Sequence, residues 1–122
     1  MSKTEQQLLG DRGEQAATDF LRQRGYTILD RNWRCKSGEL DLIVQDAVGR
    51  YIGVEVKTRS SKRYGTGFEA VNSAKYRRLQ RLMILWGKSH QTYIAQVRID
   101  VVEVYVLVQG GIVIEHLEDV RS

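Results

Sequence analysis

The sequence predicts an α/β domain in which helices flank a mixed β-sheet. Two segments, residues 8–24 and 73–87, repeat apolar side chains with the spacing of an amphipathic helix. Two others, residues 39–45 and 51–59, alternate apolar and polar side chains as β-strands do. With three further strand-like segments the order is α-β-β-β-α-β-β, which indicates an antiparallel meander followed by one crossover.

The first predicted helix, residues 8–24, has a stripe of small and apolar side chains. The stripe consists of Gly13, Ala16, Ala17, Phe20 and Leu21. Small residues on this stripe would let the helix lie close to a sheet. Gly25 stands where a helix C-cap belongs, because glycine adopts the left-handed conformation easily. A first strand is then expected at residues 26–34.

Residues 39–45 and 51–59 are expected to pair as a hairpin. Each strand has one wholly apolar face, and these faces consist of Leu40, Leu42 and Val44 in the first strand and Ile52, Val54 and Val56 in the second. Both apolar faces must meet the core, which fixes the parity of the register. A three-residue loop at 47–49 satisfies that parity, with Gly49 in a left-handed position and Asp46 opposite Arg50. A two-residue turn would instead bury charge.

The favoured register gathers acidic side chains on the other face. It puts Asp41 opposite Glu55, with Cβ atoms about 5 Å apart, and makes Glu39 face Lys57. Like charges directly opposite each other destabilise a sheet, and a hard divalent cation with oxygen ligands would offset this. Such an ion could activate water, and Lys57 could stabilise the attacking hydroxide or the phosphate charge. The alternative is a surface cluster satisfied by salt bridges.

The second predicted helix, residues 73–87, is capped by Asn72 or Ser73. Its apolar stripe consists of Leu79, Leu82, Met83 and Trp86. Two more strands are expected at residues 94–108 and 112–117, separated by a glycine pair.

Composition excludes several classes of protein. A chain of 122 residues with 42% hydrophobic and 28% charged residues suits one globular domain rather than a disordered chain. A single cysteine, Cys35, rules out an intrachain disulfide. The sequence shows neither the apolar core of a secretory signal nor an apolar run of about 18 residues. A cytoplasmic protein without a membrane span is therefore expected.

Charge is distributed unevenly along the chain. The segment 57–88 holds nine Lys and Arg residues and one acid, whereas the rest of the chain has ten basic and fourteen acidic residues. A basic block beside an acidic remainder is typical of a protein with a polyanionic partner. The alternative is a solvated helix surface.

Six short motifs give the chain a family resemblance. They are Gly13-Glu14-x-Ala16-Ala17, Gly25-Tyr26, Asn32-Trp33-Arg34, Gly38-Glu39-Leu40-Asp41-Leu42-Ile43, Val54-Glu55-Val56-Lys57-Thr58-Arg59 and Arg98-Ile99-Asp100-Val101-Val102. The chain resembles the PD-(D/E)XK nuclease superfamily, which includes restriction endonucleases and archaeal Holliday junction resolvases. More closely, it resembles the YraN-like family of bacterial proteins. The resemblance covers about residues 10–105 and implies a restriction-endonuclease-like fold, with residues 1–122 as one domain. Leu40 stands where the superfamily name has proline.

The resemblance also implies an activity, the hydrolysis of phosphodiesters in DNA with Mg²⁺ or Mn²⁺ as cofactor. It makes Asp41, Glu55 and the Val56 carbonyl metal ligands and Lys57 the catalytic lysine. Glu14 matches the position at which resolvase-like members place an acid near the metals. Structured DNA and a homodimer are implied by the resolvase-like members. The rival expectation is a non-catalytic nucleic-acid-binding module, and a protein-interaction domain is the third.

Five basic residues within the block 57–88 are candidates for phosphate contacts, which supply most non-specific affinity. These candidates are Arg59, Lys62, Arg63, Lys75 and Arg78. Aromatic residues divide into two groups: core packing is favoured over base stacking for Trp33 and Trp86, whereas Tyr64 and Tyr76 are candidate stackers.

The remaining candidates are expected to be structural. His90, His116 and Cys35 have no metal-ligand spacing and are expected to be non-catalytic. Arg98 and Asp100 share a strand face and are expected to form a structural salt bridge near the site.

Overall fold

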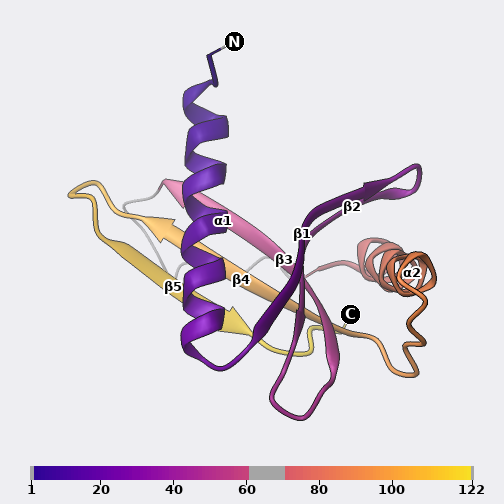
Figure 1. Cartoon of the computed structure of the whole chain (residues 1–122). Coiled ribbons are helices and arrows are strands. Elements are labelled where there is room, and N and C mark those ends of the chain that lie inside the picture. Colours follow the sequence, from indigo (N-terminus) through magenta and orange to yellow (C-terminus); the bar gives the residue numbers. More distant parts are fainter. Residues whose placement is uncertain (1, 61–70, 122) are drawn as a thin grey trace.

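The computed structural model describes residues 2–60 and 71–121 of the chain. Within these residues it has two helices and five strands in the predicted order (Figure 1). They are α1 (Glu5–Gln23), β1 (Thr27–Cys35), β2 (Gly38–Gln45), β3 (Tyr51–Ser60), α2 (Ser73–Ser89), β4 (Arg98–Val106) and β5 (Ile112–Leu117). The predicted α/β fold with a mixed sheet between helices, of the restriction-endonuclease-like type, is confirmed.

The strands lie in the sheet in their sequence order, β1-β2-β3-β4-β5. Every neighbouring pair is antiparallel except β3 and β4, which are parallel. A parallel pair needs a crossover connection, and α2 is part of the chain between these two strands. The predicted meander and single crossover are therefore confirmed.

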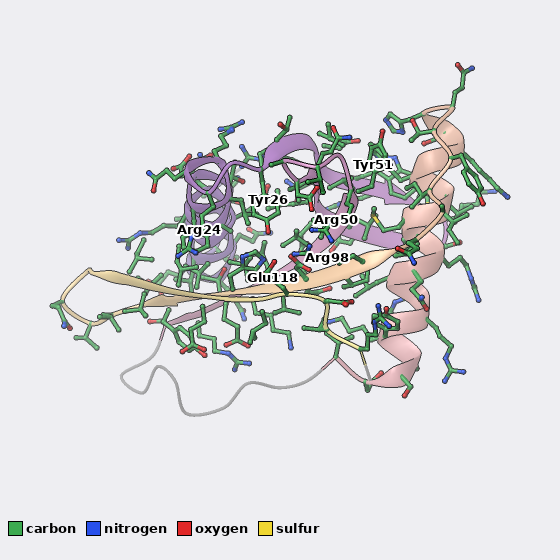
Figure 2. The ribbon with its side chains drawn as sticks, turned by 90° about the horizontal axis from the view of Figure 1, so that it is seen from below. Arg24, Tyr26, Arg50, Tyr51, Arg98 and Glu118 are labelled. Atoms are coloured by element: carbon green, nitrogen blue, oxygen red, sulfur yellow. The ribbon has the colours of Figure 1, made fainter. Side chains whose placement is uncertain are left out.

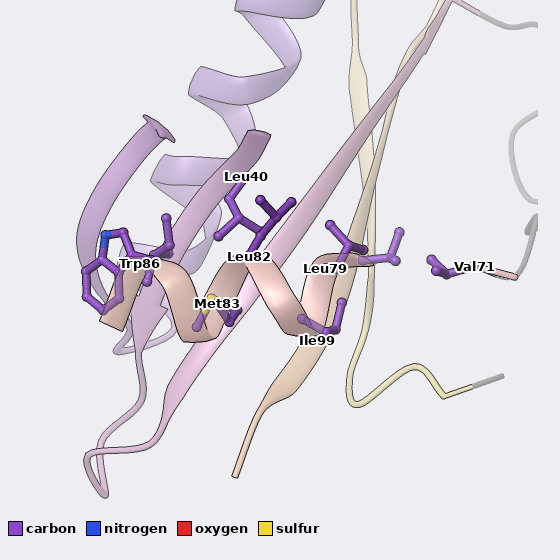
Figure 3. Packing of buried hydrophobic residues seen from close by; sticks show 9 residues of the cluster. Leu40, Val71, Leu79, Leu82, Met83, Trp86 and Ile99 are labelled. Atoms are coloured by element: carbon purple, nitrogen blue, oxygen red, sulfur yellow. The ribbon is translucent and has the colours of Figure 1, made fainter. Parts of the chain in front are cut away.

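The two helices cover opposite faces of the sheet (Figure 1). The core on the α1 side consists of Ala17, Leu21, Leu42, Val44, Ile52, Val54, Val102 and Val104. The core on the α2 side consists of Leu40, Ile43, Val71, Leu79, Leu82, Met83, Trp86, Ile99 and Val101. Figure 3 shows Leu79, Leu82, Met83 and Trp86 of α2 directed into this second core. Neither helix of the described residues is long and apolar enough to span a membrane.

The two helices begin and end close to the residues predicted from the sequence. The N-terminus of α1 begins earlier than expected, because Thr4 forms a capping box with Gln7. Gly25 follows the C-cap of α1 with a φ of +91°, as expected for a residue that ends a helix. Asn72 caps α2 by accepting a hydrogen bond from the backbone N–H of Lys75 at 2.8 Å.

The hairpin register is confirmed by the pairs Leu42–Val54 and Val44–Ile52. The backbone N–H of Asp46 donates to the Arg50 carbonyl at 3.1 Å, and Gly49 has a φ of +92°. The three-residue loop with a left-handed glycine is therefore the loop that the sequence predicted.

The predicted fourth strand, residues 94–108, was too long at both ends. In the structure β4 covers Arg98–Val106. Ile94 instead packs against the end of α2, where a Cβ on Gly87 would lie 3.1 Å from the Ile94 Cδ1 atom. At the other end, the N–H of Leu107 bonds to the Gly111 carbonyl at 2.8 Å and starts the turn. Apolar residues thus continue past the strand into turns, which periodicity does not distinguish.

The small residues of α1 let it approach the sheet, as predicted. A Cβ on Gly13 would lie 1.8 Å from Thr58 Oγ1 of β3, which is far inside contact distance. The close approach places the N-terminal half of α1 beside β3.

Candidate functional site

Asp41 lies where β2 separates from β3. The last pair between these strands is Leu42–Val54, although β3 continues beside β4 to Ser60. Beyond that pair, the Asp41 Oδ2 atom accepts a hydrogen bond from the backbone N–H of Val56 at 2.8 Å. The carboxylate thus takes the place of the missing strand partner.

The predicted opposition of Asp41 to Glu55, and of Glu39 to Lys57, is therefore wrong in detail. The register has the predicted parity, but the β2–β3 ladder ends one pair before it reaches Asp41. Glu39 is instead paired with Arg34 of β1, with which it forms a 3.0 Å salt bridge.

A change of face in β1 and β2 explains this divergence. Leu42 belongs to the core on the α1 side, whereas Leu40 belongs to the core on the α2 side. Two residues of equal parity should share a face, so the predicted apolar face of this strand is wrong for Leu40. On β1, Asn32 lies between the residues paired with Leu40 and Leu42, and it has a left-handed φ of +52°. Asp41 stands across from this irregular residue.

One side of Asp41 faces α1. A pocket of about 340 Å³ is lined by Gln6, Leu9, Gly10, Glu14, Asp41, Val56 and Thr58. Glu14 is held in place by two partners on β1, the Arg31 Nε atom at 3.1 Å and the Asn32 Nδ2 atom at 3.0 Å. Asn32 thereby links the strand irregularity to the acid on the helix.

The other side of Asp41 faces α2. A second pocket, of about 300 Å³, is lined by Ser37, Gly38, Glu39, Asp41, Glu55, Lys75, Arg78 and Leu79. Inside it, the Lys75 Nζ atom lies 3.0 Å from the Glu55 Oε1 atom. Asp41 is common to both pockets, which are otherwise formed by different helices.

The electrostatics of Asp41 differ from those of the other acids. Its pKa is raised from 3.8 to about 6, first by burial and then by the negative charges of Glu55, Glu39 and Glu14. The hydrogen bond from Val56 opposes this rise in pKa only in part. The three neighbouring acids each have a basic partner, but no described residue forms a salt bridge with Asp41. The alternative prediction, a surface cluster satisfied by salt bridges, therefore holds for Glu14, Glu39 and Glu55 but not for Asp41.

Lys57 lies on the same face of β3 as Glu55, and its register partner on β4 is Glu103. Glu103 is fully buried and lies 3.5 Å from the Nε atom of Arg59, and Tyr105 donates its hydroxyl hydrogen to it. The sequence analysis did not predict a role for this buried acid. Its position inside an otherwise apolar strand was the signal that could have indicated one. Arg59 is thus part of an internal ion pair, and its phosphate contact stays a prediction.

The oxygen donors around Asp41 suit a hard divalent cation, which neutralises carboxylates. Within the described part of the chain, no three His, Cys, Asp or Glu side chains converge closely enough to hold an ion. The expected ligand set needs only two side chains, Asp41 and Glu55, together with the Val56 carbonyl. The residues fit the ion by chemistry, because Asp41 is a desolvated oxygen donor that no described basic side chain neutralises, whereas Glu55 is paired with Lys75.

Other predicted site residues have varied surroundings. Lys62, Arg63 and Tyr64 lie outside the described residues. Arg78 lines the pocket on the α2 side, and Tyr76 packs partly against the adjacent core.

Both tryptophans pack in the core, as predicted. Trp86 is buried and donates from its Nε1 atom to Asp30 at 3.0 Å, while Trp33 is partly buried against the same cluster. His90 stacks on Trp86 at a centroid distance of 4.4 Å. Cys35 is exposed at the end of β1.

The predicted salt bridge between Arg98 and Asp100 is confirmed, but its position near the site is wrong. Arg98 donates to both carboxylate oxygens of Asp100 at 2.9 Å. Asp100 is buried and also bonds His116 at 2.8 Å. Figure 2 shows Arg98 beside Tyr26, Arg50 and Glu118, and these four line a pocket at the hairpin loop that excludes Asp41. The cluster is structural because it joins β4 to β5 and to the chain that follows.

Comparison with known proteins assigns a family. The uncharacterised protein family UPF0102 matches residues 13–104 of the chain. The chain belongs to this family. The UPF0102 match includes Glu14, Asp41 and Glu55, and it confirms the resemblance to the YraN-like family.

Individual UPF0102 relatives are similar along most of their length. The UPF0102 protein of Renibacterium salmoninarum is 48% identical over 99 residues, which are 80% of this chain and 82% of the relative. That of Paenarthrobacter aurescens is 46% identical over 115 residues, which are 94% and 92% of the two chains. That of Clavibacter michiganensis subsp. michiganensis is 50% identical over 101 residues, which are 83% and 85%.

Two solved structures are distantly similar to this UPF0102 chain. Pyrococcus furiosus SfsA, in complex with Ca²⁺, is 16% identical with a TM-score of 0.44, over 93% of this chain and 63% of that chain. The crystal structure of SSO0001 is 16% identical with a TM-score of 0.41, over 98% of this chain and 55% of that chain.

Proposed function

We propose that this protein is a metal-dependent nuclease that hydrolyses phosphodiester bonds in DNA. The observation that carries the proposal is Asp41, a desolvated carboxylate shared by two pockets and facing three other acids. An acid in this environment is costly to ionise without a cation, and strongly perturbed acids in clefts are typical of functional sites.

Each residue of the proposed site has a distinct role. Asp41 and Glu55, with the Val56 carbonyl, would hold Mg²⁺ or Mn²⁺. The ion, when bound, supplies a Lewis acid for the phosphate and lowers the pKa of a bound water. Lys57 would stabilise negative charge on the attacking water or the phosphate, since it shares the strand face of Glu55. Glu14, held by Arg31 on the opposite side of Asp41, would accept a proton from the water.

The proposed DNA surface lies along α2. This helix carries Lys75, Arg77, Arg78, Arg81 and Lys88 and no acidic residue. Lys75 and Arg78 line the pocket that contains Asp41, so a phosphate held by them would lie next to the acids. Structured DNA and a homodimer, both inferred from the resolvase-like resemblance, stay part of the proposal.

The test is cleavage of labelled duplex, flap and four-way-junction DNA in Mg²⁺ and in Mn²⁺. We expect wild type to cleave at least one of these substrates. Asp41→Asn and Lys57→Met should each reduce the rate by about 100-fold or more, since each removes a charge used in the transition state. Arg22→Gln, an exposed change on α1, is the control and should cleave like wild type.

The second candidate is a nucleic-acid-binding module without turnover. It is favoured by one observation, that Glu14 and Glu55 are each neutralised by a basic side chain of the chain itself. Wild type that binds DNA in every divalent metal tested but cleaves none of the substrates would support this module and contradict the nuclease.

A further inference from the structure

We propose that the ammonium group of Lys75 neutralises the Glu55 carboxylate in the absence of metal. When a divalent ion binds to Glu55, this ammonium group moves to a DNA phosphate. This inference rests on the proposed metal site. Lys75 would then couple the binding of the divalent ion to the binding of DNA, in addition to being one of the basic residues of α2.

The contact between the two side chains is direct and accessible. The Lys75 Nζ atom lies 3.0 Å from Glu55 Oε1, and the side chains are 31% and 19% exposed. This half-buried salt bridge neutralises Glu55, which is one of the carboxylates proposed to bind the divalent metal. A divalent ion at Glu55 would lie close to the ammonium group, and the two positive charges would repel each other.

Local structure leaves Lys75 able to move. Its backbone is fixed in the first turn of α2, where its N–H donates to the Asn72 cap at 2.8 Å. Its side chain is a flexible four-carbon stem with a compact charge, unlike the rigid guanidinium of an arginine. The ammonium group can therefore leave Glu55 without any change in the helix.

The surroundings of Lys75 indicate where the ammonium group would go. Arg78, almost one turn further along α2, lines the same pocket. The helix itself has no acid, and Glu39, which lines the same pocket as Asp41, is already paired with Arg34. The helix also exposes Arg77 and Arg81 next to Lys75 and Arg78. A phosphate in this pocket would contact both Lys75 and Arg78, so release from Glu55 would create a phosphate contact.

The exchange makes metal and DNA bind cooperatively. Metal binding frees Lys75 for phosphate, and phosphate binding draws Lys75 away from Glu55. The two ligands must then strengthen each other by the same factor, because coupling between sites is reciprocal.

The first experiment is a calorimetric titration of Mn²⁺ in the absence of DNA. Lys75→Met should bind Mn²⁺ about 3- to 10-fold more tightly than wild type, since it keeps the stem and removes the competing charge. Lys75→Arg keeps the charge and should stay near wild type. Arg22→Gln, an exposed change on α1 outside the proposed metal and DNA sites, is the control and should also stay near wild type.

The second experiment measures the affinity of a labelled DNA by fluorescence anisotropy, with and without Mn²⁺, in a Lys57→Met background in which cleavage is expected to be slow. Mn²⁺ should strengthen DNA binding when Lys75 is present. The Lys75→Met change should weaken DNA binding in Mn²⁺ and reduce the strengthening by Mn²⁺.

The outcomes separate this inference from the nuclease proposal. Mn²⁺ affinity that is unchanged or lower in Lys75→Met would overturn the role of Lys75 and leave the metal site in place. Equal Mn²⁺ binding by wild type and Glu55→Gln would overturn it too, because the ion would then lie elsewhere. Absence of Mn²⁺ binding in all variants would overturn both proposals.

Discussion

At the scale of single residues, the proposed site depends on one carboxylate that the fold makes costly to ionise. Asp41 spans two pockets, and its only hydrogen bond to a described residue comes from the Val56 backbone. Its acidic neighbours Glu14 and Glu55 have arginine or lysine partners, whereas Asp41 forms no salt bridge with any residue that the structure describes.

The raised pKa of Asp41 predicts how the stability of the metal-free protein depends on pH. With a pKa of about 6 in the folded state and 3.8 in a free acid, the folded protein holds more protons than the unfolded chain between these values. Stability therefore falls as pH rises through this window. Relative to Asp41→Asn, wild type should lose up to about 3 kcal/mol between pH 4 and pH 8.

Urea unfolding of both proteins in EDTA measures this difference. The Asn side chain can still accept the Val56 hydrogen bond, so the comparison isolates the charge. A difference in unfolding free energy that does not change with pH would mean that Asp41 titrates normally in the folded protein.

At the scale of elements, the approach of α1 to β3 decides where Glu14 lies. Gly13 touches Thr58 so closely that a Cβ there would lie 1.8 Å from the hydroxyl oxygen. Gly10, one turn earlier on the same helix, has nothing within 4 Å of such a Cβ. The space around the helix therefore requires glycine at position 13 but not at position 10.

The same substitution at these two positions should have opposite effects. Gly10→Ala should stabilise the protein by about 0.5–1 kcal/mol, because glycine in a helix interior is costly. Gly13→Ala should destabilise it by about 2 kcal/mol or more, because the helix must move off the sheet or strain its neighbours. Thermal unfolding of both variants tests this, and a stabilising Gly13→Ala would show that α1 can move away from β3 at no cost.

Most elements could be predicted from the sequence, because alternation and helical period report burial directly. The loop at Gly49 was predictable as well, since only one register parity keeps Asp41 and Glu55 out of the core. The reversal of face at Leu40 was not predictable, because it depends on a left-handed Asn32, which lies between the β1 residues paired with Leu40 and Leu42. An asparagine tolerates that conformation but does not require it.

The sequence predicted which acids gather better than how they are arranged. Glu14, Asp41 and Glu55, together with Lys75, line two adjoining pockets, whereas Lys57, the predicted catalytic lysine, lines neither of them. The salt-bridge partners of these acids and the burial of Glu103 were not predicted. Such contacts join segments that are far apart in the sequence, and they depend on tertiary packing.

At the scale of the whole molecule, the two helices on opposite faces of the sheet carry opposite charge. The helix α1 has four acids and two arginines, whereas α2 has five basic residues and no acid. The face covered by α2 should therefore attract a polyanion, and the face covered by α1 should not.

This asymmetry predicts the salt dependence of DNA binding. Replacing Arg77, Arg78 or Arg81 by Gln should weaken binding and reduce the slope of log K against log salt by about 1 for each phosphate that the variant no longer neutralises. Arg22→Gln, on the exposed surface of α1, should change neither the affinity nor the slope. Anisotropy titrations at several salt concentrations measure both quantities. If Arg22→Gln reduced the slope as much as the α2 variants do, DNA would contact both faces, and a track along α2 alone would be wrong.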